Sequence, residues 1–508
     1  MLINSASSIA TRLLGLTVLV WLQQYLLKRV SPEEYSLLVV LYNVIMFAPL
    51  LTMVLTGGLG RYVVEAYARE DDERVTQIVS TMFPILLGAG VIMLLGGGLF
   101  SWYIDYVLTI DPGYLPDARL MMGLLMFSLA VRLPMSAFTV GLYVRQRFVT
   151  QNLIQVGCEL FRLALLFVLL FGIEIRVLWI VVASVTSELL NLIISLAISV
   201  RIVPQLRFRR AFVYWPIARE LTGFGGWSFV ASLATTVRTS ADAIILNKLS
   251  TPLEVATSHV GTLASRHVYN LSLSALAPTQ PALTAMHATN DTARMQNAYL
   301  RGGRIALWAS LFPTFLLAVY SGEIMHLYAG PNFPHAGAVL AVSMLLFPVS
   351  YGTIMTSGIA NAKGQIRKWA LISSAMNVFN LALTIYVVYW LGWGALGAAA
   401  STIVCMVVFY PLFVVPLGLE LVGLRYGSWI GETLWPGMLP GLAGAVVSLV
   451  YRSAVDIDTW LAIAVSFIPG SFAYLAVLGL CLRPSDRDDL WRIVRRYRAK
   501  LRPRGEAG

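Results

Sequence analysis

The sequence has few charged residues: Asp, Glu, Lys and Arg together make up 12% of its 508 residues, whereas 58% are hydrophobic. Soluble proteins carry about 25% charged residues. The deficit excludes a soluble enzyme, a disordered regulator and a secreted disulfide scaffold. Cysteine is also scarce. Cys158, Cys405 and Cys481 each lie within an apolar run, so we expect free thiols that pack as small hydrophobic groups.

Motifs for several kinds of chemistry are absent as well. The sequence contains no Walker lysine motif, no cluster of metal ligands and no GxSxG nucleophile elbow. ATP-driven transport or hydrolysis by this chain therefore has no support, and we expect neither a metal nor a cofactor. The net charge of +11 would indicate a nucleic-acid partner in a soluble protein. Here we expect no nucleic-acid partner. In a membrane protein the positive charges must first be sorted by their position relative to the bilayer, so the net charge alone does not indicate a partner.

Long apolar segments are abundant. A membrane-spanning helix needs about 20 mainly apolar residues. Fourteen segments fit: 9–27, 37–56, 78–100, 120–142, 153–172, 177–199, 223–246, 255–277, 305–321, 337–359, 369–391, 395–415, 434–451 and 459–481. We therefore predict an all-α integral membrane protein of 14 spans. The longest stretch between spans is 278–304, which is too short for a folded soluble domain, so binding must take place within the bundle.

The basic residues predict the orientation, because Lys and Arg concentrate on the cytoplasmic side of a membrane. With a cytoplasmic N-terminus, 26 of the 37 basic residues fall in cytoplasmic segments and 6 on the opposite side. Both termini are then cytoplasmic. The tail, residues 482–508, carries nine of these basic residues and fits either a topological anchor or a segment at the anionic lipid surface.

The chain contains an internal repeat at an offset of 220 residues. Lys28, Pro32 and Glu34 align with Lys248, Pro252 and Glu254, Arg147 aligns with Arg367, and Gly172 aligns with Gly392. Six crossings restore the starting side, so the repeat predicts two parallel six-helix lobes, a known transporter design with the substrate site between the lobes. The predicted domains are an N-lobe at 1–200, a cytoplasmic linker at 201–222, a C-lobe at 223–415, spans 13 and 14 at 416–481 and a basic tail at 482–508.

Ionisable residues at bilayer depth require a partner or a polar cavity. Glu159 and Arg162, spaced i,i+3, and Arg238 and Asp242, spaced i,i+4, can each pair on one helix face. Such a pair either neutralises its own charge or has a functional role, and the sequence leaves both open. Ser228, Ser232, Thr235, Arg238 and Asp242 form one polar stripe on span 7. This stripe should line a cavity or a polar seam.

Two further arginines have no acid within one turn on their own helix. They are Arg132 in span 4 and Arg266 in span 8. A cavity lined by Arg132, Arg238 and Arg266 would be cationic and would suit an anionic headgroup such as pyrophosphate. His267, Glu188 and Asp242 could titrate and couple transport to protons, although a buried histidine on a polar helix is more often simply hydrogen-bonded. Arg12 lies near the start of span 1, where its side chain can reach the cytoplasmic interface.

Two short segments carry a family resemblance. Residues 28–35, KRVSPEEY, close span 1, and residues 56–61, TGGLGR, end span 2. This start resembles the Wzx-type polysaccharide flippases of the MOP superfamily, which also holds the multidrug and toxic compound extruders (MATE) and the lipid II flippase. The resemblance extends along almost the whole chain.

The resemblance implies translocation of an undecaprenyl-pyrophosphate-linked oligosaccharide, such as an O-antigen or exopolysaccharide repeat unit, to the periplasmic leaflet by alternating access. It also implies a bacterial inner-membrane location, membrane lipids as partners and cooperation with polysaccharide polymerase or assembly proteins. Cavity arginines would hold the phosphates, a role that falls here to Arg266 first and to Arg132 and Arg238 next.

Three alternatives remain open. A cation-coupled drug or metabolite antiporter of the same fold would more often have an acidic cavity, whereas the spans here hold five basic and three acidic residues. A lipid II flippase would have the same electrostatics. A membrane glycosyltransferase or polymerase usually has a large periplasmic loop, but the longest such loop predicted here is 101–119.

Overall fold

The protein is helical throughout the part that the structure describes. The computed structural model describes residues 24–47, 59–145, 147–218, 236, 240–276, 279, 283, 286–287, 289–483 and 486, and these contain α, 3-10 and π helices but no strand. The all-α prediction is confirmed. The three cysteines are free thiols.

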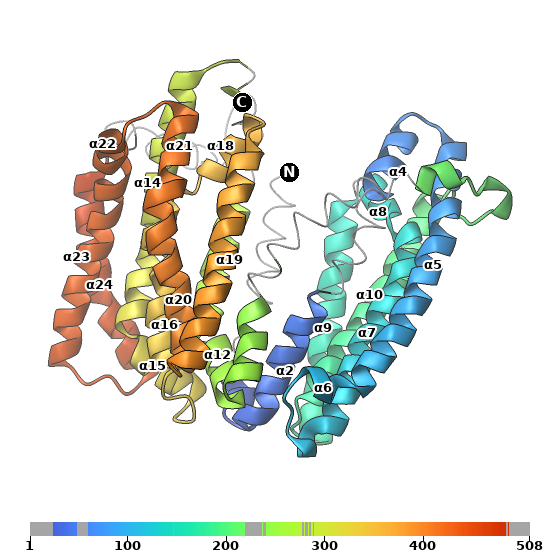
Figure 1. Cartoon of the computed structure of the whole chain (residues 1–508), viewed down its shortest axis with the longest axis horizontal. Coiled ribbons are helices and arrows are strands. Elements are labelled where there is room, and N and C mark those ends of the chain that lie inside the picture. The colour runs from blue at the N-terminus through green and yellow to red at the C-terminus, as the bar shows by residue number, and fades with distance from the viewer. Residues whose placement is uncertain are drawn as a thin grey trace, which may run out of the picture. The chain divides into compact units, whose positions relative to one another are not determined.

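The chain forms two compact units. Unit 1 comprises 1–259, 329–333 and 381–398, and unit 2 comprises 260–328, 334–380 and 399–508. The bounds of these two units differ from those of the N-lobe and C-lobe predicted from the sequence. The division into two lobes stays a prediction. In chain order the first helices are α2 (Pro32–Ile45), α4 (Leu59–Ala68), α5 (Asp72–Trp102), α6 (Ile104–Val107), η1 (Pro112–Tyr114), α7 (Leu115–Thr139), α8 (Gly141–Val144), α9 (Phe148–Gly172), α10 (Leu178–Ile202) and η2 (Arg210–Phe212), all in unit 1 (Figure 1).

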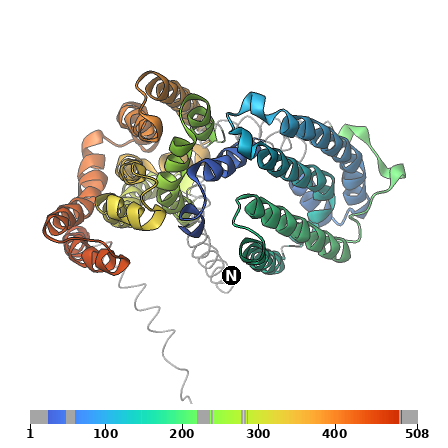
Figure 2. The same ribbon diagram turned by 90° about the horizontal axis from the view of Figure 1, so that it is seen from below.

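The remaining helices belong mainly to unit 2. They are α12 (Pro252–Leu276), α14 (Thr292–Val319), α15 (Ser321–Ala329), α16 (Ala336–Met344), α17 (Leu346–Ser350), η3 (Tyr351–Thr353), α18 (Thr356–Ala362), α19 (Ile366–Trp390), α20 (Gly394–Phe409), η4 (Tyr410–Val414), α21 (Val415–Val422), α22 (Tyr426–Trp429), η5 (Ile430–Leu434), α23 (Trp435–Ala454) and α24 (Trp460–Cys481). The start of α12, the end of α19 and the start of α20 lie in unit 1. Figure 2 shows helices of both units nearly end-on, packed side by side as bundles.

Ten helices in the described residues are long and apolar enough to cross a membrane. They cover 72–102, 112–144, 149–172, 178–202, 292–319, 336–353, 367–390, 394–422, 426–452 and 460–481, and each overlaps one predicted span. Predicted spans 1, 2 and 7 lie partly or largely outside the described residues. The span predicted at 255–277 is a helix, α12, but it is too polar to be counted among the ten. The count of 14 therefore stays a prediction.

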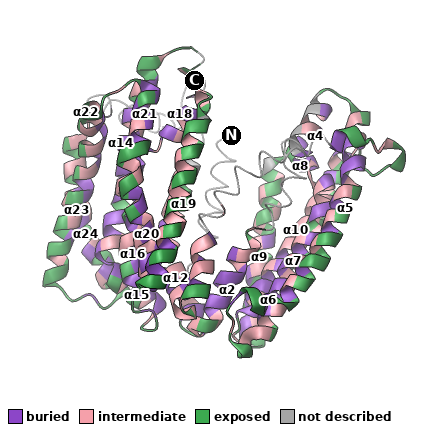
Figure 3. Cartoon of the chain, viewed as in Figure 1, coloured by how far each residue is buried: buried purple, intermediate pink, exposed green. Residues whose placement is uncertain are grey.

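Exposed apolar residues follow helical spacing on the helices that would face lipid. On α24 the exposed positions recur at steps of three and four residues: Leu461, Val465, Ile468, Phe472 and Leu475. The opposite face includes the small residues Ser466 and Gly470 and packs against α23, where a Cβ added at Gly470 would lie 2.0 Å from the Ser448 hydroxyl oxygen. Exposed apolar surface on one face and close packing of small residues on the other are typical of membrane helices. Exposed residues also run along α5 and α19 (Figure 3).

The internal repeat has a structural counterpart at the start of α5 and of α14. Glu70 and Asn290 are the only described non-glycine residues with positive φ, at 58° and 54°. The next residue in each case is an aspartate that caps its helix: Asp71 accepts a hydrogen bond from the Arg74 backbone N–H at 2.9 Å, and Asp291 accepts one from the Arg294 N–H at 3.0 Å. All three pairs of positions are 220 residues apart. Two helices thus begin with the same local geometry, which supports the repeat.

Candidate functional site

Polar residues of α7 and α10 meet within unit 1, in the apolar parts of both helices. The Arg132 guanidinium donates a hydrogen bond to Glu188 Oε1 at 2.9 Å, and the Ser128 hydroxyl donates to Glu188 Oε2 at 3.0 Å. Ser128 and Arg132 are four residues apart and therefore share one face of α7. Both oxygens of the carboxylate are engaged, yet the Arg132 side chain is 62% exposed and that of Glu188 41%. The pair is consequently open to an approaching ligand.

A second ion pair lies on α9. Arg162 Nε donates to Glu159 Oε2 at 3.0 Å, and a second guanidinium nitrogen of Arg162 contacts the other carboxylate oxygen. This two-point contact has the planar geometry that favours guanidinium–carboxylate pairs. The i,i+3 spacing in the sequence indicated this contact, and the structure contains it. Its functional role stays a prediction.

Tyr42 of α2 lies near both ion pairs. Its hydroxyl is close to the Ser184 side chain of α10 and within electrostatic range of both Arg162 and Glu188. We refer to Tyr42, Ser128, Arg132, Glu159, Arg162, Ser184 and Glu188 as the unit 1 polar cluster. It contains two arginines and two glutamates, so it is neutral as a whole. Neutral pairs of this kind lower the penalty for placing charge at membrane depth.

The cluster changes the expectation for Arg132. The sequence places no acid within one turn of Arg132 on its own helix, which led us to expect a positive charge without a local partner. The structure pairs it with Glu188, which is 56 residues away on α10. The sequence indicates Glu188 as a residue for proton coupling or for a charge pair, but it does not identify Arg132 as its partner. Any anion that binds Arg132 must therefore compete with this carboxylate.

The other predicted site residues lie elsewhere. Arg266 is exposed and His267 half-buried, both on α12. Asp242 is half-buried in the helical stretch before residue 250. Its expected partner Arg238, and with it most of the polar stripe on span 7, lies outside the described residues. The substrate-binding roles of Arg266, Arg132 and Arg238 thus stay predictions.

The turns that contain Glu34 and Glu254, which the 220-residue repeat aligns, have a structural role in unit 1 that the sequence did not indicate. Glu34 Oε1 accepts a hydrogen bond from the Val177 N–H at 2.7 Å, just before α10. Glu254 Oε2 accepts one from the Ala395 N–H at 2.6 Å, in the first turn of α20. The two glutamates are equivalent by the 220-residue offset, and each satisfies a backbone N–H at the start of a later helix. Such N–H groups have no partner within their own helix. The repeated glutamate was visible in the sequence, but its distant partner was not.

The environment of Glu34 favours its protonated form. Burial raises the pKa of this carboxyl, and nearby Asp117 and Glu174 raise it further, whereas the Val177 N–H and Arg176 act in the opposite direction. A carboxyl whose pKa is raised on folding contributes stability at low pH, and this contribution is lost as the pH rises through the raised value. Glu34 therefore makes the folded state more stable in acid.

Removing either glutamate should destabilise the fold. We expect Glu34→Ala and Glu254→Ala each to lower the free energy of unfolding by about 1–3 kcal/mol, because each leaves one buried N–H without an acceptor. Thermal unfolding in detergent is the measurement, with Glu33→Ala, which removes an exposed carboxylate from the same turn, as the matched control. Glu34→Gln should keep the acceptor, and the stability of the wild type relative to this variant should rise as the pH falls. Equal effects of Glu33→Ala and Glu34→Ala would contradict the assignment.

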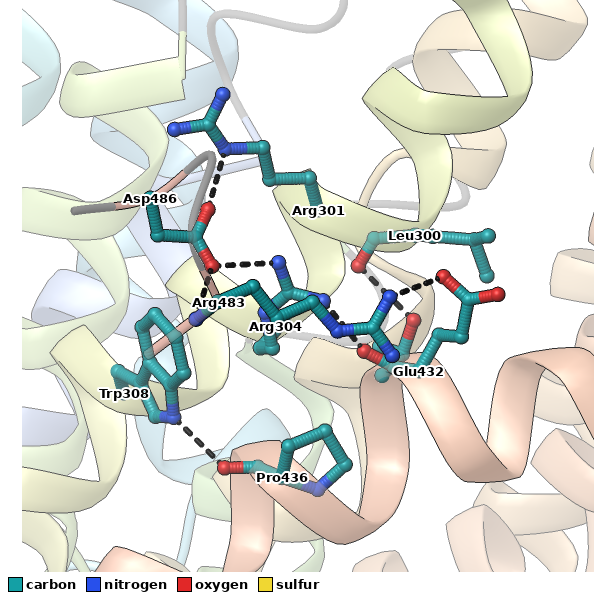
Figure 4. A network of polar contacts seen from close by, with 9 residues as sticks. Leu300, Arg301, Arg304, Trp308, Glu432, Pro436, Arg483 and Asp486 are labelled. Atoms are coloured by element: carbon teal, nitrogen blue, oxygen red, sulfur yellow. Dashed lines mark hydrogen bonds and ion pairs between the residues drawn. The ribbon is translucent and has the colours of Figure 1, made fainter. Parts of the chain in front are cut away.

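A buried charge network in unit 2 involves the segment after α24 (Figure 4). Asp486 lies between two arginines of α14: Arg304 Nη2 approaches Asp486 Oδ2 at 2.7 Å, and Arg301 Nε approaches Asp486 Oδ1 at 2.8 Å. Arg304 also donates to the backbone oxygen of Glu432 at 2.7 Å, within the π-helical segment η5. Arg483 in turn pairs with the Glu432 carboxylate at 2.7 Å. The network fastens the first residues after the last span to α14.

Comparison with known proteins gives the chain its family. Residues 1–278, more than half of the chain, match the profile of the family described as "Polysaccharide biosynthesis protein". The chain belongs to this family. A relative over nearly the whole length is the "Uncharacterized membrane protein EpsK" of Bacillus subtilis (strain 168), 23% identical over 520 residues, which cover 98% of each chain.

Solved structures agree on the fold. The lipid II flippase MurJ in an inward closed conformation matches with a TM-score of 0.67 at 14% identity, covering 94% of this chain and 98% of its own. An inward-facing multidrug resistance MATE transporter of the MOP superfamily matches with a TM-score of 0.62 at 13% identity, covering 79% and 93%. The family match and the shared fold agree with the resemblance that the sequence indicated. The two neighbours are a lipid II flippase and a multidrug transporter, and this chain is a multi-span membrane protein.

Proposed function

We propose that this protein flips an undecaprenyl-pyrophosphate-linked oligosaccharide, an O-antigen or exopolysaccharide repeat unit, from the cytoplasmic to the periplasmic leaflet of a bacterial inner membrane. The observation that carries the proposal is the family match of residues 1–278 together with the full-length likeness to a lipid II flippase. Both termini are then cytoplasmic, and the reaction makes and breaks no covalent bond. Polysaccharide polymerase or assembly proteins would receive the product.

The charges of the described residues suit an anionic headgroup. The unit 1 polar cluster contains two arginines for its two glutamates, so it has no acidic excess that would attract a cationic drug. Arg266 is exposed on α12, a helix more polar than its neighbours. Guanidinium groups bind phosphate oxygens through two parallel hydrogen bonds. A pyrophosphate could therefore engage Arg266. At Arg132, a phosphate would have to compete with Glu188.

The alternative within the same fold is a cation-coupled drug or metabolite antiporter, and a lipid II flippase is a variant of the first proposal. The likeness to a multidrug transporter favours the antiporter only at the level of the fold. The two functions differ in their substrates. Reconstituted protein should accelerate the exposure of a fluorescent lipid-linked oligosaccharide and should leave the efflux of cationic dyes at the level of protein-free vesicles. The reverse outcome would establish the antiporter.

The site itself is tested at Arg266. We expect Arg266→Ala to slow flipping about tenfold, because one charge-assisted hydrogen bond to the pyrophosphate is lost and such a bond is worth about 1.5–3 kcal/mol. Arg266→Lys should retain most of the rate. Arg201→Ala, which removes an exposed arginine at the end of α10, is the matched control. Unchanged flipping by Arg266→Ala at normal expression would refute the role of Arg266 while leaving the function in place.

A further inference from the structure

The segment that follows α10 is fixed to α5 by its backbone. The hydroxyl groups of Thr76, Ser80 and Thr81 hold it at three successive points. Thr76 donates to the Gln205 oxygen at 3.1 Å, Ser80 accepts from the Arg209 N–H at 2.9 Å, and Thr81 accepts from the Tyr214 N–H at 2.9 Å. Val203, Leu206 and Ile217 are buried in the core that α5 helps to form. The segment thus has a fixed path along the end of α5.

The arginine side chains of this segment are exposed, whereas the Phe208 ring also contacts Phe83 of α5, with 5.4 Å between the ring centroids. We call residues 207–215 the basic strap. Arg207, Arg209 and Arg210 are exposed, and the aromatic residues Phe208, Tyr214 and Trp215 are 43%, 53% and 64% exposed. Residues 207–215 contain no acid. The strap therefore presents three positive charges together with exposed aromatic rings.

The strap arginines differ from most arginines in the spans and at their ends. Arg119, Arg132, Arg162, Arg301, Arg304, Arg452 and Arg483 each have a carboxylate partner. Among the described residues, no carboxylate pairs with Arg207, Arg209 or Arg210, although Asp72 and Glu73 lie only one turn before Thr76 on α5. In the part of the chain that the structure describes, the one contact of these guanidinium groups is with an aromatic ring: Arg209 lies over the Phe212 ring, 5.7 Å from its centroid.

We propose that the basic strap binds the phosphate groups of anionic phospholipids in the adjacent leaflet. Guanidinium groups match phosphate oxygens in two-point contacts. Clusters of basic residues next to membrane helices attract anionic lipids, and Trp and Tyr settle at the level of the headgroups. Because its backbone is already held by α5, lipid binding would have to order only the side chains of the strap. The inference does not depend on which substrate the protein transports.

Native mass spectrometry of the full-length protein, titrated with phosphatidylglycerol or phosphatidylcholine, tests the proposal. We expect R207Q/R209Q/R210Q to weaken phosphatidylglycerol binding at least about tenfold, since each basic residue near an anionic surface adds to the attraction. Binding of phosphatidylcholine should stay the same. R207K/R209K/R210K should retain the preference for phosphatidylglycerol, and higher salt should reduce it because exposed charges are screened.

The matched control is R294Q/R367Q/R425Q. It removes the same number of positive charges from exposed arginines that belong to three separate segments of unit 2. This variant should bind phosphatidylglycerol like the wild type. If both triple variants lost the same amount of phosphatidylglycerol binding, only the net charge would matter and the proposal would be overturned. Unchanged phosphatidylglycerol binding in both variants would also overturn it. A strap variant that binds phosphatidylglycerol normally but loses farnesyl pyrophosphate would also overturn it and would assign the strap to prenyl carriers.

Discussion

Replacing Asp486 with alanine should lower the free energy of unfolding by about 3–5 kcal/mol, the usual result of removing one partner from a buried ion pair. The side chains of Arg304 and Asp486 are 3% and 5% exposed. Without the carboxylate, Arg304 would stay buried with the Glu432 backbone oxygen as its one acceptor among the described residues, and Arg301 would lose its contact with Asp486. Thermal unfolding in detergent and the yield of monodisperse protein would report the loss.

The same network offers a matched control. Arg483 and Glu432 form an ion pair of similar length, but their side chains are 41% and 40% exposed, so Glu432→Gln should change stability by no more than about 1 kcal/mol. A second variant, R304M/D486L, replaces both buried charges with apolar groups and should recover much of the stability. If Asp486→Ala unfolded like Glu432→Gln, the buried pair would not anchor the segment after α24.

The sequence predicted the interactions that lie within one helix better than those that join two helices. The Glu159–Arg162 pair follows from i,i+3 spacing, and the apolar helices follow from hydropathy over about 20 residues. Arg132 and Glu188 lie 56 residues apart, and Arg304 and Asp486 lie 182 residues apart. Both contacts depend on how helices pack, which a single sequence does not specify.

One structural feature was missed although the signal was present. Asp71 and Asp291 obey the same 220-residue offset as Glu34 and Glu254 and cap the first turns of α5 and α14. They could have been added to the repeat from the sequence alone, since an aspartate before a helix is a common N-cap. The long-range hydrogen bonds of Glu34 and Glu254 could not be predicted from the sequence, because each depends on where the start of a distant helix lies.

The second large effect is expected at Glu188. Glu188→Ala should lower the free energy of unfolding by about 2.5–3.5 kcal/mol and reduce the yield of folded protein, because it leaves Arg132 uncompensated within a membrane helix. Thermal unfolding in detergent would measure the loss. Ser128→Ala, which removes only a neutral hydroxyl from the same carboxylate, is the control and should have a small effect.

The double variant R132A/E188A separates the two roles that Arg132 can have. Removing both charges eliminates the unpaired guanidinium, so stability should return close to that of the wild type. Flipping by this variant, measured with a fluorescent lipid-linked oligosaccharide in vesicles, should be about tenfold slower than in the wild type, because the pyrophosphate loses one guanidinium ligand worth about 1.5–3 kcal/mol. Flipping at the wild-type rate would show that Arg132 serves only to neutralise Glu188. The phosphate-binding role would then rest on Arg266 and Arg238.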